Sequence, residues 1–328
     1  MKEAANSLNL HGVGLGTFPF SNVFGKVSAD DAAAITRYYL RHGSGYIQTS
    51  PYYKDVEPLL GRILANVPRD SYKIATLCVK DKESRLSGKF DAVVAQCNDS
   101  LSRLGLEYVD LLMTSTPEAK DVPYAETIEA MQELKAQGKI RAIGVCNVTL
   151  EQLKEYNATG AVEYVQNRFS LIDQEADRDV REYCVQYGIG LIPYNVIEWG
   201  LLTDKMLQEW TLRDGDLRTK VLPVFGQSQK ELLREWIQED LKPIANEYHT
   251  TIEGLAISWV LQQPGVVTCP VGATTVSQMA ASLDYLENID NTEILAKLNG
   301  AYEALVTKVQ DVHGVALNAY LKNSYGRW

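Results

Sequence analysis

The sequence predicts an α/β protein, a (β/α)8 TIM barrel with a long loop after the seventh strand and a C-terminal tail. Short apolar runs alternate with longer amphipathic segments almost to the end of the 328 residues. Most of the apolar runs are continuous rather than alternating, which is typical of parallel strands covered on both faces. Eight such runs with helical segments between them favour a barrel over a doubly wound sheet.

The expected strands and helices follow these patterns. Strands are expected at 12–17, 46–50, 72–80, 108–116, 140–147, 163–171, 190–196 and 266–273. Clear helical patterns cover 29–42, 90–104, 125–136 and 178–187. Ser28 is expected to cap the first helix, and Thr149 with Gln152 has the spacing of a capping box. Glycines expected to take a positive φ after helix ends are Gly43, Gly105, Gly138 and Gly188.

No linker rich in Pro, Gly or Ser divides the chain, so we expect one domain over residues 1–328. Two regions break the βα period. One is a long mixed segment at 199–229, and the other is the tail at 308–328 with Tyr320, Tyr325 and Trp328. Long loops in compact domains are usually lids or binding loops.

Composition excludes several classes of protein. The net charge of -10 and the pI near 5.0 argue against nucleic-acid binding through the overall field. No apolar run is long enough to cross a membrane, and residues 1–6 lack the apolar stretch of a signal peptide. The five cysteines are scattered, which argues against a disulfide framework and against a metal site. We expect a cytoplasmic protein with a small-molecule substrate; composition does not predict its oligomeric state.

Short motifs then occur in a fixed order along the chain. They are L-G-T at 15–17, Y-I-Q-T-S-P-Y-Y at 46–53, S-L-S-R-L-G at 100–105, Y-V-D-L-L at 108–112, G-K-I-R-A-I-G-V-C-N at 138–147, V-Q-N-R-F-S-L at 165–171 and G-L-L-T-D-K at 200–205. In this order they resemble the aldo-keto reductase family over nearly the whole chain. The resemblance implies a barrel that binds NAD(P)H in an extended pose and reduces carbonyls.

The family's catalytic tetrad consists of an aspartate, a tyrosine, a lysine and a histidine. By the resemblance, these positions are Gln48, Tyr53, Leu77 and Ser115, so only Tyr53 keeps its residue type. A phenol has an ordinary pKa of about 10, and a nearby ammonium held by a carboxylate makes the phenolate easier to form. Gln48 and Leu77 supply neither charge. Since general acid catalysis is typically worth roughly 10²–10⁴-fold, Tyr53 alone predicts slow reduction.

Two lysines are candidates to replace the missing one. Lys80 follows Leu77 by three positions near the same strand end, where barrels place their active sites. Lys54 follows Tyr53 directly. For each, solvent exposure is the simpler interpretation. Ser115 remains a candidate hydrogen-bond donor to a substrate oxygen, although a hydroxyl is a poor acid.

The resemblance also implies a cofactor site. Gly16 and Thr17 match its first-strand motif, while Asn147, Gln166 and Tyr194 match positions that hold the nicotinamide amide and stack on its ring. At the adenosine end, Thr274 stands where the family commonly has a basic residue. Gln278 lies in the same phosphate segment, and Ser282 stands at a usual asparagine position. A 2′-phosphate favours an Arg or Lys partner, so we expect weak NADP binding or none.

Residues at the end of the fifth strand and after the seventh strand also depart from the family pattern. Cys146 replaces a serine that is a better hydrogen-bond partner. Glu198 and Trp199 stand where small residues are usual. An acidic side chain is unfavourable beside a pyrophosphate, unless Glu198 points to solvent. We expect Trp199 to pack within the loop rather than against a substrate.

Three functions stay open. The first is an atypical NAD(P)-linked oxidoreductase that acts on a carbonyl, alcohol or sugar-like substrate through Tyr53, with Gln48 as a neutral partner. The second is a non-redox lyase or isomerase in which Tyr53 moves protons. The third is a catalytically silent relative kept as a binding partner. We prefer the first, because the nicotinamide positions are better kept than the tetrad.

Overall fold

The computed structural model describes residues 6–78, 88–115, 122–175, 177–208, 212, 216–221, 227–285, 292–317 and 319–320. Eight parallel strands form one sheet in the order β7-β6-β5-β4-β3-β2-β1-β8. The strands are β1 (Val13–Gly16), β2 (Tyr46–Gln48), β3 (Lys73–Cys78), β4 (Val109–Ser115), β5 (Ile140–Cys146), β6 (Tyr164–Gln166), β7 (Gly190–Leu191) and β8 (Cys269–Gly272). The predicted (β/α)8 fold is confirmed.

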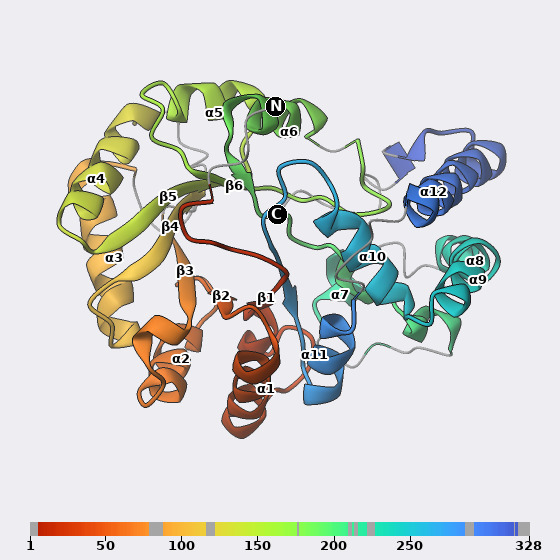
Figure 1. The fold of residues 1–328 in the computed structure, drawn as a ribbon, viewed down its shortest axis with the longest axis horizontal. Helices are drawn as coiled ribbons and strands as arrows, with labels where there is room; N and C mark the ends of the chain where they lie inside the picture. Colours follow the sequence, from red (N-terminus) through yellow and green to blue (C-terminus); the bar gives the residue numbers. More distant parts are fainter. Residues whose placement is uncertain are drawn as a thin grey trace.

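The sheet is strongly curled (Figure 1). The Leu191 amide of β7 donates to the Gly265 carbonyl at 2.8 Å, and the Val267 amide donates back to Leu191 at 2.9 Å. These bonds join β7 to the segment that leads into β8. The carboxyl ends of all the strands therefore point toward one rim.

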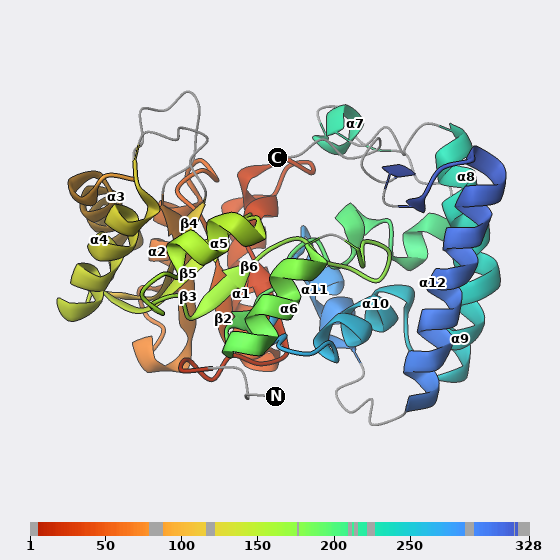
Figure 2. The same ribbon diagram turned by 90° about the horizontal axis from the view of Figure 1, so that it is seen from above.

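Helices surround the strands (Figures 1 and 2). They are α1 (Ala29–His42), α2 (Val56–Leu64), α3 (Phe90–Leu104), α4 (Tyr124–Ala136), α5 (Leu150–Tyr156), α6 (Arg178–Tyr187), α7 (Arg218–Val221), α8 (Gln227–Trp236), α9 (Lys242–Glu247), α10 (Ile252–Leu261), α11 (Val276–Leu283) and α12 (Thr292–His313). Short 3₁₀ turns are η1 (Phe18–Ser21), η2 (Arg69–Ser71), η3 (Glu198–Gly200) and η4 (Asp204–Leu207). A π-helical turn, η6 (Ile237–Leu241), joins α8 to α9, where Pro243 cannot donate its backbone hydrogen bond.

The predicted helix caps form, with one exception. Ser28 and Asp31 make a capping box at α1, as do Thr149 and Gln152 at α5. Gly105, Gly138 and Gly188 take positive φ angles. The prediction is wrong for Gly43, which has a φ of −102°. Glycine is needed there because a Cβ would lie 2.3 Å from the Tyr39 ring.

Strands β6 and β7 are shorter than predicted. After Gln166, the Asn167 side chain donates to the Val148 carbonyl at 2.8 Å and accepts from the Val148 amide at 3.1 Å. A side chain thus takes the place of the backbone ladder. In the other segment, Pro193 has no amide hydrogen, and Asn195 turns the chain with a φ of 61°. Both interruptions lie at the rim.

The barrel interior is a small apolar cluster whose upper layer includes Leu77, Met113 and Cys146. Leu8 and Leu10 belong to the same cluster, and the Leu8 amide donates to the Tyr164 hydroxyl at 3.0 Å. The interior is therefore a packed core rather than a channel.

Helix α12 lies beside α8 and α9 on the side away from α3 and α4 (Figure 1). Trp236 of α8 is fully buried and donates to the Ala301 carbonyl of α12 at 2.7 Å. Tyr320, from the predicted C-terminal tail, is buried and stacks on His313 at the end of α12, whereas Tyr325 and Trp328 lie outside the described residues. Among the described residues, no helix combines the length and apolarity that a membrane span requires.

Candidate functional site

A cavity of about 860 Å³ opens at the carboxyl ends of the strands. Its wall includes nine of the ten predicted site residues: Gly16, Gln48, Tyr53, Ser115, Asn147, Gln166, Tyr194, Thr274 and Gln278. The strand register explains the gathering, since Gln48 pairs with Gly16 of β1, and Cys146 pairs with both Ser115 and Gln166. Residues far apart in sequence thus meet at one level of the barrel.

Thr17 is the predicted site residue that does not line the cavity. It is fully buried, and its hydroxyl donates to the Gln48 carbonyl at 3.0 Å. The Thr17 amide donates to the same oxygen at 3.0 Å. Thr17 thereby fixes the end of β1 against the end of β2 and holds Gln48 at the rim.

Tyr53 stands in a neutral environment. Burial raises the pKa of Tyr53 to about 12, and the side-chain hydrogen bond with Gln48 only partly offsets this effect. Gln48 is itself buried, and its amide nitrogen donates to the Thr49 carbonyl at 3.2 Å. A phenol held in this way is a weaker acid than free tyrosine.

The positions of the lysine and the histidine in the tetrad hold Leu77 and Ser115, both buried in the cavity wall. Leu77 lies two residues after Ala75, and Ala75 pairs with Gln48 across the sheet. Lys54 is exposed and does not line the cavity, and Lys80 lies outside the described residues. Among the described residues, no lysine, arginine, aspartate or glutamate contributes to the pKa shift of Tyr53; the coulombic contribution comes from Cys146 and raises the pKa.

The end of the cavity near β5 to β7 offers hydrogen-bond donors. The Tyr194 hydroxyl donates to Asn147 Oδ1 at 2.7 Å, which ties the aromatic ring to the rim. Gln166 is 3% exposed, and its Nε2 has no hydrogen-bond partner among the described residues. Its Oε1 accepts a long bond from Cys146 Sγ at 3.7 Å. A buried amide donor without a partner, next to an aromatic ring, fits a planar group with a carboxamide, as in nicotinamide.

The opposite end of the cavity lies at α11, with Thr274, Gln278 and Ser282 in its wall. Both the amide and the hydroxyl of Thr274 donate to Gln278 Oε1, at 2.8 and 2.9 Å. The Ser282 hydroxyl donates to the Gln278 carbonyl at 3.1 Å. These polar groups therefore bond mainly to one another.

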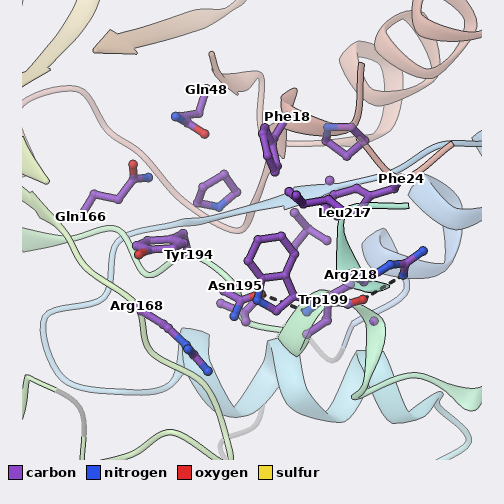
Figure 3. A pocket seen from close by; sticks show the side chains of 18 of the residues that line it. Phe18, Phe24, Gln48, Gln166, Arg168, Tyr194, Asn195, Trp199, Leu217 and Arg218 are labelled. Atoms are coloured by element: carbon purple, nitrogen blue, oxygen red, sulfur yellow. Dashed lines mark hydrogen bonds between the residues drawn. The ribbon is translucent and has the colours of Figure 1, made fainter. Parts of the chain in front are cut away.

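Three aromatic rings form a cluster over the cavity that the sequence patterns did not predict. The ring centres of Phe18 and Phe24 lie 5.5 Å apart. The ring centre of Trp199 lies 6.4 Å from that of Phe18 and 5.6 Å from that of Phe24. Phe18 also lies 4.9 Å from the Tyr53 ring. Figure 3 shows this cluster facing Tyr194 and Gln166 across the cavity. The F-P-F run directly after the first strand holds Phe18, but nothing in the sequence marks Phe24 or Trp199 as its neighbours. Trp199 therefore packs within the loop and also lines the cavity.

Residues 216–221 extend over the same cluster. The Leu217 amide donates to the Val23 carbonyl at 2.8 Å, which ties this segment to the loop after β1. Arg218 forms a two-pronged ion pair with Asp216, donates to the Trp199 carbonyl at 3.0 Å and lies over the Phe24 ring. Lys205 also lines the cavity. Lys205 thus places a positive charge in the cavity wall, whereas the charge of Arg218 is compensated by Asp216.

Glu198 is fully buried, so the solvent-exposed alternative is wrong. Its carboxylate accepts bonds from Arg168 at 2.8 Å, Ser170 at 2.5 Å and Asn195 at 2.9 Å. Burial raises the pKa of Glu198 to about 7, although the Arg168 guanidinium opposes the shift. The turn is strained, since Asn195, Glu198 and Trp199 all have positive φ. The carboxylate binds Asn195 of its own loop and Arg168 and Ser170 of the segment after β6, rather than facing a phosphate.

Comparison with known proteins agrees with this geometry. The model of the Aldo/keto reductase family matches residues 12–303. The chain is 29% identical to the NADH-specific methylglyoxal reductase of Escherichia coli K12, over 79% of this chain and 83% of that protein. It is 32% identical to the aldo-keto reductase YhdN of Bacillus subtilis 168, over 82% and 83%.

A solved structure shows the same fold. The glycerol dehydrogenase AKR11B4 of Gluconobacter oxydans superposes with a TM-score of 0.78 at 25% identity, covering 90% of this chain and 92% of that one. The strand order, the rim cavity and the family match over residues 12–303 lead to one conclusion. The chain belongs to the aldo/keto reductase family.

Proposed function

We propose that the protein is an NAD(P)H-linked oxidoreductase that interconverts a small carbonyl compound and its alcohol, with Tyr53 as the proton donor. One observation carries the proposal. The unpartnered amide of Gln166 and the bonded pair Tyr194–Asn147 line the same cavity as Tyr53. A carboxamide donor, a ring platform and a proton donor are the groups that reduction by a nicotinamide requires.

The cofactor would be held along the cavity. Gln166 and Asn147 suit its carboxamide, and the Tyr194 ring suits its nicotinamide face. Among the described cations of the cavity wall, Lys205 is best placed for its phosphates, since Arg168 is bound by Glu198 and Asp173 and Arg218 by Asp216. When bound, the nicotinamide supplies or accepts the hydride.

The residues of this chain then govern the proton. Tyr53 donates from its hydroxyl to the substrate oxygen as negative charge develops there. Gln48 orients that hydroxyl by its hydrogen bond, and Ser115 offers a second donor to the same oxygen. Because burial raises the pKa of Tyr53 to about 12, proton transfer is poorly driven and turnover is slow.

The substrate is proposed from the cavity and from the relatives. The names of two similar proteins give methylglyoxal and glycerol as their substrates. Both are small and polar, and Phe18 of the aromatic cluster packs 4.9 Å from the Tyr53 ring at the reacting end. We infer a short-chain aldehyde, ketone or polyol and take methylglyoxal as the first probe.

The test is Tyr53→Phe with methylglyoxal and NADH. We expect turnover to fall by roughly 10²–10⁴-fold, because the proton donor is lost, while the Kd for NADH changes less than about twofold. NADH binding is followed by tryptophan fluorescence. Tyr187→Phe, on the exposed surface of α6, is the matched control and should behave as wild type.

Two other results would redirect the assignment. If wild type binds neither NADH nor NADPH at millimolar concentration, the redox proposal is wrong and a silent relative is favoured. If product forms without cofactor and Tyr53→Phe abolishes it, the protein is a lyase or isomerase. Unchanged turnover in Tyr53→Phe would remove Tyr53 from the mechanism.

A further inference from the structure

Glu253 lines the α11 end of the cavity, and the mechanism above does not use it. It is the second residue of α10, just after the N-cap Thr251. The first turn of α10 packs closely on the end of α11, since a Cβ on Gly254 would lie 3.0 Å from the Asp284 carbonyl oxygen. Glu253 therefore stands beside the helix that carries Gln278 and Ser282.

The carboxylate of Glu253 is partly buried, and among the described residues it has no hydrogen-bond or ion-pair partner. Lys205 attracts it from beyond ion-pair distance, and Asp204 repels it. Asp204 is itself bound to Lys242 at 2.7 Å. Burial raises the pKa of Glu253 to about 7. Burying a carboxylate without a hydrogen-bond partner costs free energy, and a ligand that donates a hydrogen bond to it would offset that cost.

The rest of this end is unsuited to a phosphate. Helix α11 contains no charged residue between Val276 and Leu283. The amide and hydroxyl of Thr274, which could otherwise meet a phosphate, both donate to Gln278 Oε1. Acceptors for hydroxyl groups are thus present, while free donors for an anion are scarce.

Resting on the proposed function, we propose that Glu253 sets the cofactor preference by accepting a hydrogen bond from the free ribose hydroxyls of NADH and repelling the 2′-phosphate of NADPH. A hydroxyl donor bound to a carboxylate forms a charge-assisted bond, which is stronger than a neutral one. A phosphate dianion at the same place would face an ionised carboxylate in a partly desolvated setting, where like-charge repulsion is poorly screened.

The experiment compares equilibrium binding rather than turnover. Dissociation constants of NADH and NADPH are measured by tryptophan fluorescence at pH 8, where the Glu253 carboxyl is ionised. We expect wild type to bind NADH more tightly, by roughly tenfold or more. Glu253→Gln should lower the ratio of the Kd for NADPH to the Kd for NADH by roughly tenfold, mainly because NADPH binds more tightly. Glu303→Gln, on the exposed face of α12, is the matched control and should leave the ratio unchanged.

ADP-ribose and its 2′-phosphorylated form, used as competitors, locate the effect, because neither contains nicotinamide. If Glu253→Gln changes the ratio of the dissociation constants of these two fragments to the same extent, the effect of Glu253 is assigned to the adenosine end of the cofactor. An unchanged ratio in both Glu253→Gln and Glu253→Ala, with NADH still bound, overturns the proposal for Glu253 alone. Absence of binding of either dinucleotide to wild type instead overturns the proposed function. Thermal melting confirms that each variant is folded.

Discussion

Gln48→Asp combined with Leu77→Lys is expected to raise kcat for methylglyoxal reduction by about 10²-fold, at the low end of typical general acid catalysis. An ammonium within about 4–6 Å favours the ionised form of a phenol and lowers its pKa by about 1 to 3. Tyr53 now has a pKa of about 12 and a neutral Gln48 as its side-chain partner. The double variant would supply the two charges that the site lacks.

The barrel geometry makes the two changes interdependent. Gln48 ends β2, and Leu77 lies on the neighbouring β3 two residues beyond Ala75, the pairing partner of Gln48. Leu77 is 8% exposed and belongs to the apolar cluster inside the barrel. A lone lysine there would be a buried unpaired charge, which is strongly destabilising, whereas a facing aspartate would compensate it.

The four-member cycle is therefore the informative measurement. We expect Gln48→Asp alone to give no increase in kcat and Leu77→Lys alone to lower the melting temperature. Adding Tyr53→Phe to the double variant should remove the gain. Equal activity of a folded double variant and wild type would show that charge around Tyr53 does not limit the reaction.

A second large effect is expected in the pH dependence of stability. The pKa of Glu198 is about 7 in the folded protein, against an ordinary value of 4.5. Between these values the folded state holds more protons than the unfolded state. The Glu198 contribution therefore lowers the free energy of unfolding as pH rises from 4.5 to 7, by at most about 1.4 kcal/mol per pH unit. The charged groups that face it are Arg168 and Asp173.

Glu198→Gln removes this titration and keeps the shape of the side chain. We expect urea unfolding to give a flatter dependence on pH for Glu198→Gln than for wild type between pH 4.5 and 7. Glu253→Gln removes a different carboxyl with a raised pKa, one whose shift comes from burial, Asp204 and Lys205 and not from Arg168, so the two effects should add. Identical pH slopes for wild type and Glu198→Gln would mean that Arg168 keeps the carboxylate ionised throughout.

The sequence predicted the fold well because the signals for its elements are local. Continuous apolar runs and caps such as Ser28 and Thr149 depend on neighbouring residues, and the structure confirms them. The register that brings Gln48, Ser115 and Gln166 to one rim followed from the resemblance to a family of barrels. Gly43 fails as a positive-φ residue because the constraint comes from the ring of Tyr39, one helical turn earlier.

Long-range side-chain contacts were not predictable from one sequence. The burial of Glu198 depends on Arg168, 30 residues away in the chain. The aromatic cluster joins Phe18 and Phe24 to Trp199, and nothing local marks these rings as neighbours. Glu253 gave no signal because a glutamate near a helix start is ordinary. Each became informative only when folding placed it against the cavity.

The pH dependence of alcohol oxidation tests the central claim, that Tyr53 lacks charged assistance, most directly. In this direction Tyr53 accepts a proton as phenolate. With a pKa of about 12, log kcat for glycerol and NAD⁺ should rise with unit slope from pH 7 to 10 and reach no plateau. A plateau that begins below pH 9, in a reaction that Tyr53→Phe abolishes, would show that a nearby charge lowers the pKa of Tyr53. That result would contradict the claim.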